Sequence, residues 1–166
     1  MTNHLQVHIL GAGPAGLIAA ETLARAGAAV TVFERKPVPA RKFLMAGRGG
    51  LNITHSEHID SFLARYGAGR TMVETAIRGF TPDMLRDWCA ALGEETFVGS
   101  SGRVFPKTMK ASPLVRAWLT RLSAQGVEIR TRMTWLGWSS AGVLRLTQDG
   151  AVTTLRPAAT LLALGG

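Results

Sequence analysis

The sequence contains a single cysteine, Cys89, among its 166 residues. One thiol cannot form an internal disulfide, and it excludes the paired redox cysteines of enzymes that work through a dithiol. Any redox chemistry of this chain must therefore come from a bound cofactor. Cys89 follows Trp88 in a segment of helical period, so we expect it to be a small residue of the core.

The sequence also lacks a long apolar run. None reaches the roughly 18–20 residues that span a bilayer. The N-terminal residues Met1-Thr2-Asn3-His4 lack the basic region and hydrophobic stretch of a secretory signal. We therefore expect a cytoplasmic protein with no membrane partner.

Acidic residues are few, with 11 Asp and Glu against 19 Lys and Arg, which gives a formal net charge of +8. Such a charge attracts nucleic acid, an anionic cofactor or anionic lipid. The basic residues are scattered, and Arg35-Lys36 with Arg41-Lys42 form the densest group. Because no basic stripe with interleaved aromatic residues is present, the sequence does not favour a nucleic-acid partner.

What the sequence does have is a complete βαβ pattern over residues 7–34. An apolar strand at Leu5 to Leu10 leads into a glycine-rich turn, a helix is expected over Pro14 to Ala26, and a second strand over Ala29 to Phe33. The turn reads Gly11-Ala12-Gly13-Pro14-Ala15-Gly16, the G-x-G-x-x-G fingerprint of dinucleotide-binding proteins.

Each part of this pattern has a physical task. Gly11 permits the tight turn, Gly13 lets the backbone approach a pyrophosphate, and Gly16 lets the helix pack close to the strand. The helix N-terminus then stabilises the phosphates. Glu34, 18 residues after Gly16, is placed to accept hydrogen bonds from an adenosine ribose and repels a 2′-phosphate. The unit therefore favours FAD or NAD over NADP.

The rest of the chain predicts further strands and helices. Residues 35–56 indicate a long loop with room for one short helix. The expected helices cover 57–66, 71–78, a segment from Thr81-Pro82-Asp83 to Gly93, and one from Ser112-Pro113 to Gly126. The expected strands cover 95–98, 103–105, 127–131, 134–138, 143–147, 152–155 and 160–163. The predicted fold is α/β, with a Rossmann-like parallel sheet, a helical insertion at 55–95 and an antiparallel β-meander.

Three segments resemble the YhiN/BaiN-like bacterial flavoproteins, the NAD(FAD)-utilising dehydrogenases. Residues 41–54 are similar to that family's K-x-L-x-S-G-G-G-R-C-N-x-T-N loop. The matching positions are Lys42, Leu44, Gly47, Gly49, Asn52 and Thr54. Arg48, Gly50 and Leu51 depart from the pattern, with the arginine moved by two positions. Residues 102–106 and 110–111 resemble the G-R-x-F-P and K-A segment, and residues 161–166 resemble a strand ending in A-T-G-G.

The resemblance implies a glutathione-reductase-like FAD-binding domain of the ββα type. It implies an oxidoreductase with FAD as cofactor, reduced NAD(P)H as transient donor and a small-molecule substrate. Residues expected at the cofactor are Gly11, Ala12, Gly13, Pro14, Ala15, Gly16, Glu34, Arg35, Arg41, Lys42, Gly47, Gly49, Gly50, Asn52, Ala163 and Gly165. Arg48, Asn52 and Arg103 are the catalytic candidates. Proteins of this family continue into a second domain, so a C-terminal substrate domain is expected to be missing here.

Other interpretations of the sequence remain open. The two histidines of His55-Ser56-Glu57-His58 are spaced like metal ligands on a helix, but a third ligand is not evident, and a polar helix entry is the simpler interpretation. We expect no metal site. The alternative functions are a tRNA-modifying flavoprotein, an NAD-binding module and an inactive fragment.

Overall fold

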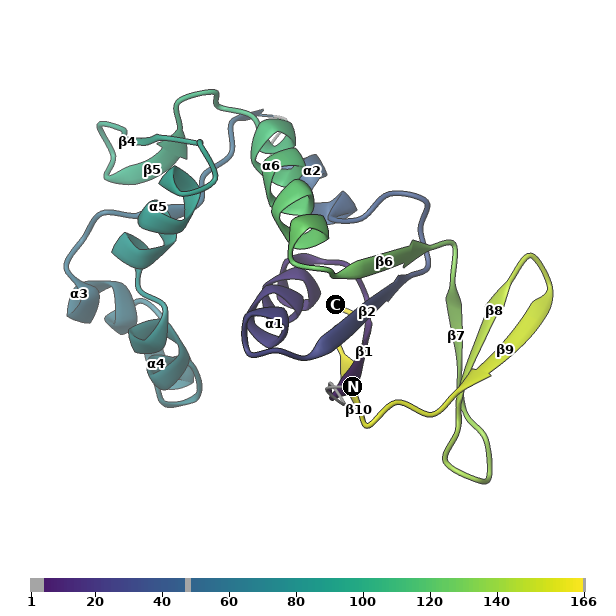
Figure 1. Ribbon diagram of the computed structural model, residues 1–166. Coiled ribbons are helices and arrows are strands. Elements are labelled where there is room, and N and C mark those ends of the chain that lie inside the picture. Colours follow the sequence, from purple (N-terminus) through teal and green to yellow (C-terminus); the bar gives the residue numbers. More distant parts are fainter. Residues whose placement is uncertain (1–4, 47–48, 166) are drawn as a thin grey trace. The chain divides into compact units, whose positions relative to one another are not determined.

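The computed structural model describes residues 5–46 and 49–165 (Figure 1). The chain forms two compact units. Unit 1 consists of Met1–Phe43 and Leu119–Gly166, and unit 2 of Leu44–Trp118. Both boundaries fall within helices, one in α2 (Arg41–Ala46) and one in α6 (Ala111–Ala124).

Unit 1 is built on a four-stranded parallel sheet with the order β10-β1-β2-β6. Its elements, apart from its shares of α2 and α6, are β1 (Gln6–Leu10), α1 (Pro14–Arg25), β2 (Ala29–Glu34), β6 (Glu128–Thr131), β7 (Thr134–Trp138), β8 (Leu144–Gln148), β9 (Ala151–Leu155) and β10 (Ala159–Leu162). Strand β1 is central and buried from Val7 to Leu10, as its continuous apolar run predicts. The expected parallel sheet is confirmed.

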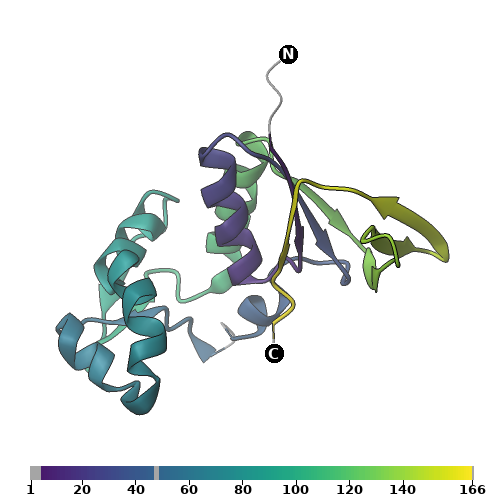
Figure 2. The same ribbon diagram turned by 90° about the horizontal axis from the view of Figure 1, so that it is seen from below.

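The two faces of β1 and β2 pack against different partners (Figure 2). Helix α1 lies on one side, where Leu17 and Ala20 are fully buried. The antiparallel meander β7-β8-β9 lies on the other side. There Leu10 and Phe33 form an apolar cluster with Met133, Leu144 and Leu146.

Unit 2 combines helices with a small antiparallel sheet of order β3-β5-β4. Its elements, apart from its shares of α2 and α6, are β3 (Thr54–His55), α3 (Ile59–Ala64), the 3₁₀ turn η2 (Gly67–Gly69), α4 (Arg70–Gly79), α5 (Pro82–Ala90), β4 (Thr96–Val98) and β5 (Arg103–Pro106). Helix α5 begins as its sequence predicts. Thr81 Oγ1 accepts the N–H of Met84 at 3.2 Å, and Pro82 occupies the first turn.

Two stretches differ in detail from the sequence-based expectation. The loop expected at 35–56 holds a short helix, α2, and also the two-residue strand β3, which pairs with β5. Helix α6 begins at Ala111 rather than beside Ser112, so Pro113 is its third residue. Proline is tolerated there because N–H groups of a first turn have no intrahelical partner. Among the described residues, no helix has the length and apolar character needed to cross a membrane.

Candidate functional site

The ends of three parallel strands meet at the carboxyl edge of the unit 1 sheet. Gly11 N donates to the carbonyl oxygen of Phe33 at 2.8 Å, which joins the ends of β1 and β2. Ala163 N donates to the carbonyl oxygen of Leu10 at 2.8 Å, which joins the ends of β10 and β1. Open α/β sheets bind their ligands at this edge.

The glycines of the turn are required for different reasons. Gly11 has φ +107°, and a Cβ there would lie 2.3 Å from the carbonyl oxygen of Ala163. A Cβ on Gly16 would lie 1.9 Å from the carbonyl oxygen of Gly11. A Cβ on Gly13 would meet no atom within 4 Å. Gly11 and Gly16 therefore allow the turn itself to close, whereas Gly13 borders open space.

The N-terminus of α1 faces this space without a side-chain cap from the described residues. Gly13 is the N-cap residue, with φ −78° and ψ 177°, and its carbonyl oxygen accepts the first helical hydrogen bond from Leu17 N at 2.9 Å. Pro14 and Ala15 are exposed in the first turn. First-turn N–H groups and the positive end of a helix dipole bind phosphates.

Glu34 lies at the end of β2, beside the turn. Its Oε2 accepts the backbone N–H of Ala12 at 2.9 Å, and its Oε1 accepts that of Lys36 at 2.7 Å. Each carboxylate oxygen keeps a further lone pair for a ribose hydroxyl. Because the amide of Ala12 donates to Glu34, it is not directed at the open space beside Gly13. The N–H groups left for a phosphate are those that follow Ala12 in the turn and in the first turn of α1.

A pocket of about 310 Å³ adjoins Glu34, and sequence reasoning missed much of its lining. It is lined by Leu10, Gly11, Phe33, Glu34, Arg35, Met133, Thr134, Trp135 and Leu164. Met133 N donates to the carbonyl oxygen of Glu34 at 2.9 Å, which fixes the connection between β6 and β7 at this edge. Trp135 Nε1 is buried and has no hydrogen-bond partner among the described residues. The pocket could hold the adenosine part of a dinucleotide, with the Trp135 side chain as part of its wall.

Two further predicted residues lie at the same edge. Ala40 N donates to the carbonyl oxygen of Ala12 at 2.7 Å, which anchors the start of α2 to the glycine-rich turn. Arg41 and Lys42 follow and are exposed. A Cβ on Gly165 would lie 3.7 Å from Lys42 Nζ, so this ammonium group is beside the segment that follows β10. Lys42 is therefore a basic side chain at the same edge of the sheet as the glycine-rich turn.

The remaining predicted residues lie in unit 2 or outside the described residues. Gly47 and Arg48 lie outside them, between the described ranges 5–46 and 49–165. Gly49 and Asn52 are exposed, Gly50 has φ +108°, and Leu51 N donates to the carbonyl oxygen of Met109 at 3.1 Å. Arg103 is exposed on β5. Contact of this loop with a flavin and a catalytic role of Arg103 stay predictions.

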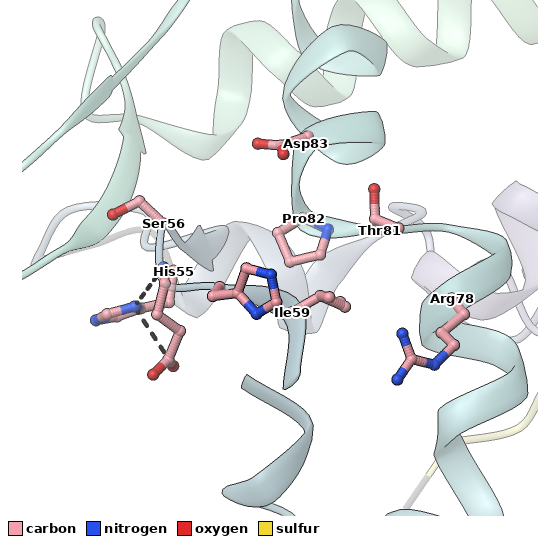
Figure 3. A pocket seen from close by; sticks show the side chains of 9 residues that line it. His55, Ser56, Ile59, Arg78, Thr81, Pro82 and Asp83 are labelled. Atoms are coloured by element: carbon pink, nitrogen blue, oxygen red, sulfur yellow. Dashed lines mark hydrogen bonds and ion pairs between the residues drawn. The ribbon is translucent and has the colours of Figure 1, made fainter. Parts of the chain in front are cut away.

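A second pocket, of about 430 Å³, lies in unit 2 around the two histidines (Figure 3). His55 Nδ1 accepts the N–H of Glu57 at 3.2 Å, and His58 Nδ1 accepts that of Asp60 at 3.4 Å. His58 is the N-cap of α3. Both rings therefore hold backbone amides at a helix entry. Within residues 5–46 and 49–165 no three His, Cys, Asp or Glu side chains form a metal-binding group.

Taken together, the parallel sheet, the glycine-rich turn and the carboxylate after β2 define a Rossmann-like dinucleotide-binding domain. The profile of one family, the HI0933-like protein Rossmann domain, matches residues 5–166. The chain belongs to this family, and the resemblance expected from its sequence is confirmed.

Known proteins and structures resemble parts of the chain. A ribosomal RNA dihydrouridine synthase of Haemophilus influenzae is 44% identical over 57 residues, which are 34% of this chain and 14% of that protein. The crystal structure of Thermovibrio ammonificans THI4 matches 98% of this chain and 58% of its own, with a TM-score of 0.58 and 18% identity. A 3-ketosteroid-delta4-(5alpha)-dehydrogenase of Rhodococcus jostii RHA1 matches 96% and 46%, with a TM-score of 0.63 and 15% identity. The chain thus spans less than two thirds of each relative's length.

Proposed function

We propose that this chain is the FAD-binding part of a flavoprotein oxidoreductase. In the proposed reaction FAD takes a hydride from a reduced nicotinamide and passes it to an organic acceptor. One observation carries the proposal: open space at Gly13, the N-terminus of α1 and the Glu34 carboxylate share one edge of the sheet. This is the donor and acceptor set that an adenine dinucleotide needs.

Different residues at this edge would bind different parts of the cofactor. The first turn of α1 and Lys42 would hold the pyrophosphate, Glu34 the ribose, and the pocket beside Trp135 the adenine. Glu34 retains a carboxylate at the ribose, which disfavours a 2′-phosphate. The flavin ring itself would supply the redox chemistry, since the one thiol of the chain is buried.

Absorbance spectroscopy of the purified protein tests this proposal. FAD is added to cofactor-stripped protein, excess ligand is removed, and the flavin spectrum is recorded with and without NAD as competitor. We expect retained flavin that NAD does not displace. A protein that takes up NAD but not FAD would be an NAD-binding module, and one that takes up neither would contradict the proposal.

A base of ribosomal RNA is the specific acceptor that we propose to test first. The supporting observation is the 44% identity over 57 residues to a protein named ribosomal RNA dihydrouridine synthase. The formal charge of +8 also suits a polyanionic substrate. Reduction of a uracil would place a hydride on one carbon of its C5–C6 double bond and a proton on the other, while NAD(P)H becomes NAD(P)⁺.

Mass spectrometry of nucleosides tests the acceptor separately. Ribosomal RNA from cells lacking the gene should contain less dihydrouridine than RNA from the parent strain. Complementation with the wild-type gene should restore it. Unchanged dihydrouridine, in cells whose protein binds FAD, would leave the flavoprotein proposal standing and remove RNA as the acceptor.

A further inference from the structure

The small sheet of unit 2 has two unlike faces. Thr96, Val98, Val104 and Pro106 alternate onto one face, where Val104 and Pro106 are buried. Arg86 Nε on α5 donates to Thr96 Oγ1 at 3.2 Å, so α5 packs against the Thr96 end of this face, whereas Val98 is exposed. The other face carries Phe97, Arg103 and Phe105, and we call it the aromatic face.

The aromatic face presents two rings side by side. Phe97 and Phe105 are directly paired across β4 and β5, with ring centroids 5.8 Å apart and planes inclined by 30°. Phe97 is 39% exposed. Gly99 packs against Phe105, because a Cβ on Gly99 would lie 3.3 Å from Phe105 Cε2. The exposed ring of Phe97 and the half-buried ring of Phe105, stacked on each other and braced from the backbone, form a stacking platform.

An exposed cation lies beside these rings. Arg103 is two residues from Phe105 on β5, which is about 7 Å along the strand, and it is exposed on the same face. Among the described residues no acidic side chain pairs with Arg103. The carboxylates nearest the face are paired with other cations, Glu95 with Lys107 and Glu57 with Arg65, so the exposed guanidinium of Arg103 is the charge available to an anion.

We propose that the aromatic face binds single-stranded RNA, with an unpaired base stacked on Phe97 and Phe105 and a phosphate held by Arg103. Exposed aromatic residues on a sheet, combined with a guanidinium group, are how proteins hold single-stranded bases and their backbone. Stacking needs a base that is free of a duplex. This inference rests on the proposed RNA acceptor, for which it supplies a docking surface.

The test measures the affinity of the FAD-loaded full chain for a fluorescently labelled oligouridine by anisotropy. Phe97→Ala should weaken binding by roughly 5- to 100-fold, as loss of base stacking does. Phe97→Trp should keep it. The matched control is Phe80→Ala, since Phe80 is 40% exposed at the end of α4. Arg103→Gln should reduce the salt dependence of binding by about one phosphate contact, whereas Arg116→Gln on α6 is its control.

The measurements distinguish this inference from the two proposals on which it depends, the flavoprotein and its RNA acceptor. Unchanged oligouridine affinity in Phe97→Ala and Arg103→Gln, with wild-type protein binding RNA, overturns the aromatic face alone. Absence of RNA binding by a protein that retains FAD overturns the face and the RNA acceptor but not the flavoprotein. Equal binding of oligouridine and duplex RNA overturns stacking. A lower melting temperature of Phe97→Ala with unchanged RNA affinity shows that another protein surface covers the ring, which also overturns the inference.

Discussion

Glu34 Oε2 accepts the backbone N–H of Ala12 at 2.9 Å, so the residue expected to hold a ribose also holds the glycine-rich turn in place. The two roles use different lone pairs of one carboxylate. A substitution at this position therefore acts on the ligand and on the shape of its site together.

Replacement of Glu34 by glutamine removes the charge and keeps the size of the side chain. We expect FAD affinity to fall about fivefold or more, because hydrogen bonds to an ionised acceptor are stronger than neutral ones by about 1 kcal/mol or more. Titration of flavin fluorescence measures the change. Glu128→Gln on β6 is the control, since that carboxylate pairs with Arg130. Equal affinities for Glu34→Gln and wild type would remove Glu34 from the site.

Alanine at Gly13 and at Gly16 should separate binding from folding. At Gly13 the new methyl group meets no atom, so stability should stay within about 0.5 kcal/mol while FAD affinity falls. At Gly16 it meets the carbonyl oxygen of Gly11, and such overpacking should cost about 1–3 kcal/mol or more. Thermal unfolding and flavin titration are compared for both variants. A Gly13→Ala protein with full FAD affinity would contradict the assigned pyrophosphate position.

Glu21 is a buried acid that binds two arginines of unequal exposure. Its Oε1 is 3.2 Å from Arg121 Nη1 and 2.5 Å from Arg25 Nη2, and these arginine side chains are 18% and 58% exposed. Arg121→Ala should destabilise the fold by about 2–3 kcal/mol, because a buried charge loses its shielded partner. Arg25→Ala should cost at most about 1 kcal/mol. Urea unfolding measures the free energy of unfolding of both variants. A larger decrease for Arg25→Ala than for Arg121→Ala would contradict the prediction.

Glu74 makes the stability of unit 2 depend on pH. Hydrogen bonds from Arg70 and Arg78 lower the pKa of Glu74 from its ordinary 4.5 to about 2. A carboxyl group with a lowered folded-state pKa stabilises the fold above pH 4.5, and this stabilisation is lost as the pH falls toward 2. Glu74→Gln should therefore lower the melting temperature near neutral pH, and its difference from wild type should shrink with acidification. Asp87→Asn, at an exposed acid of α5, is the control; a difference independent of pH would contradict the prediction.

The thiol of Cys89 should be inert in the folded protein. Burial, followed by the charge of Glu94, raises its pKa to about 11, so little thiolate forms at pH 8. Ellman's reagent should react slowly with native protein and fully after denaturation in guanidinium chloride. Rapid reaction of the native protein would show that α5 opens readily. The same experiment checks the interpretation of Cys89 as a core residue.

The sequence was a good guide wherever the signal lies within one element or one turn. The apolar run of β1, the first-turn proline of α1 and the Thr81 cap of α5 each act on neighbouring residues, so their patterns could be interpreted directly. The short strand β3 could not be predicted, because two residues carry no period and Thr54–His55 are extended only by pairing with β5. The roles of Asn52 and Arg103 as catalytic candidates remain predictions.

In the candidate site too, local patterns could be predicted from the sequence and contacts between distant segments could not. The spacing from Gly11 to Glu34 indicated the dinucleotide unit, since one turn and two adjacent strands contain it. Met133, Thr134 and Trp135 were missed as site residues because they follow Glu34 by about a hundred positions and reach it through the pairing of β6 with β2. No local pattern records such a pairing.

The amino-acid sequence by itself therefore determined most of the helices and strands, the family and the glycine-rich turn, because each depends on short-range spacing. Only the tertiary structure decided that Gly16 must clear the Gly11 carbonyl, that Ala163 closes the sheet edge and that Phe97 and Phe105 share an open face. These relationships join residues through strand register and close packing, and such contacts exist only once the chain has folded.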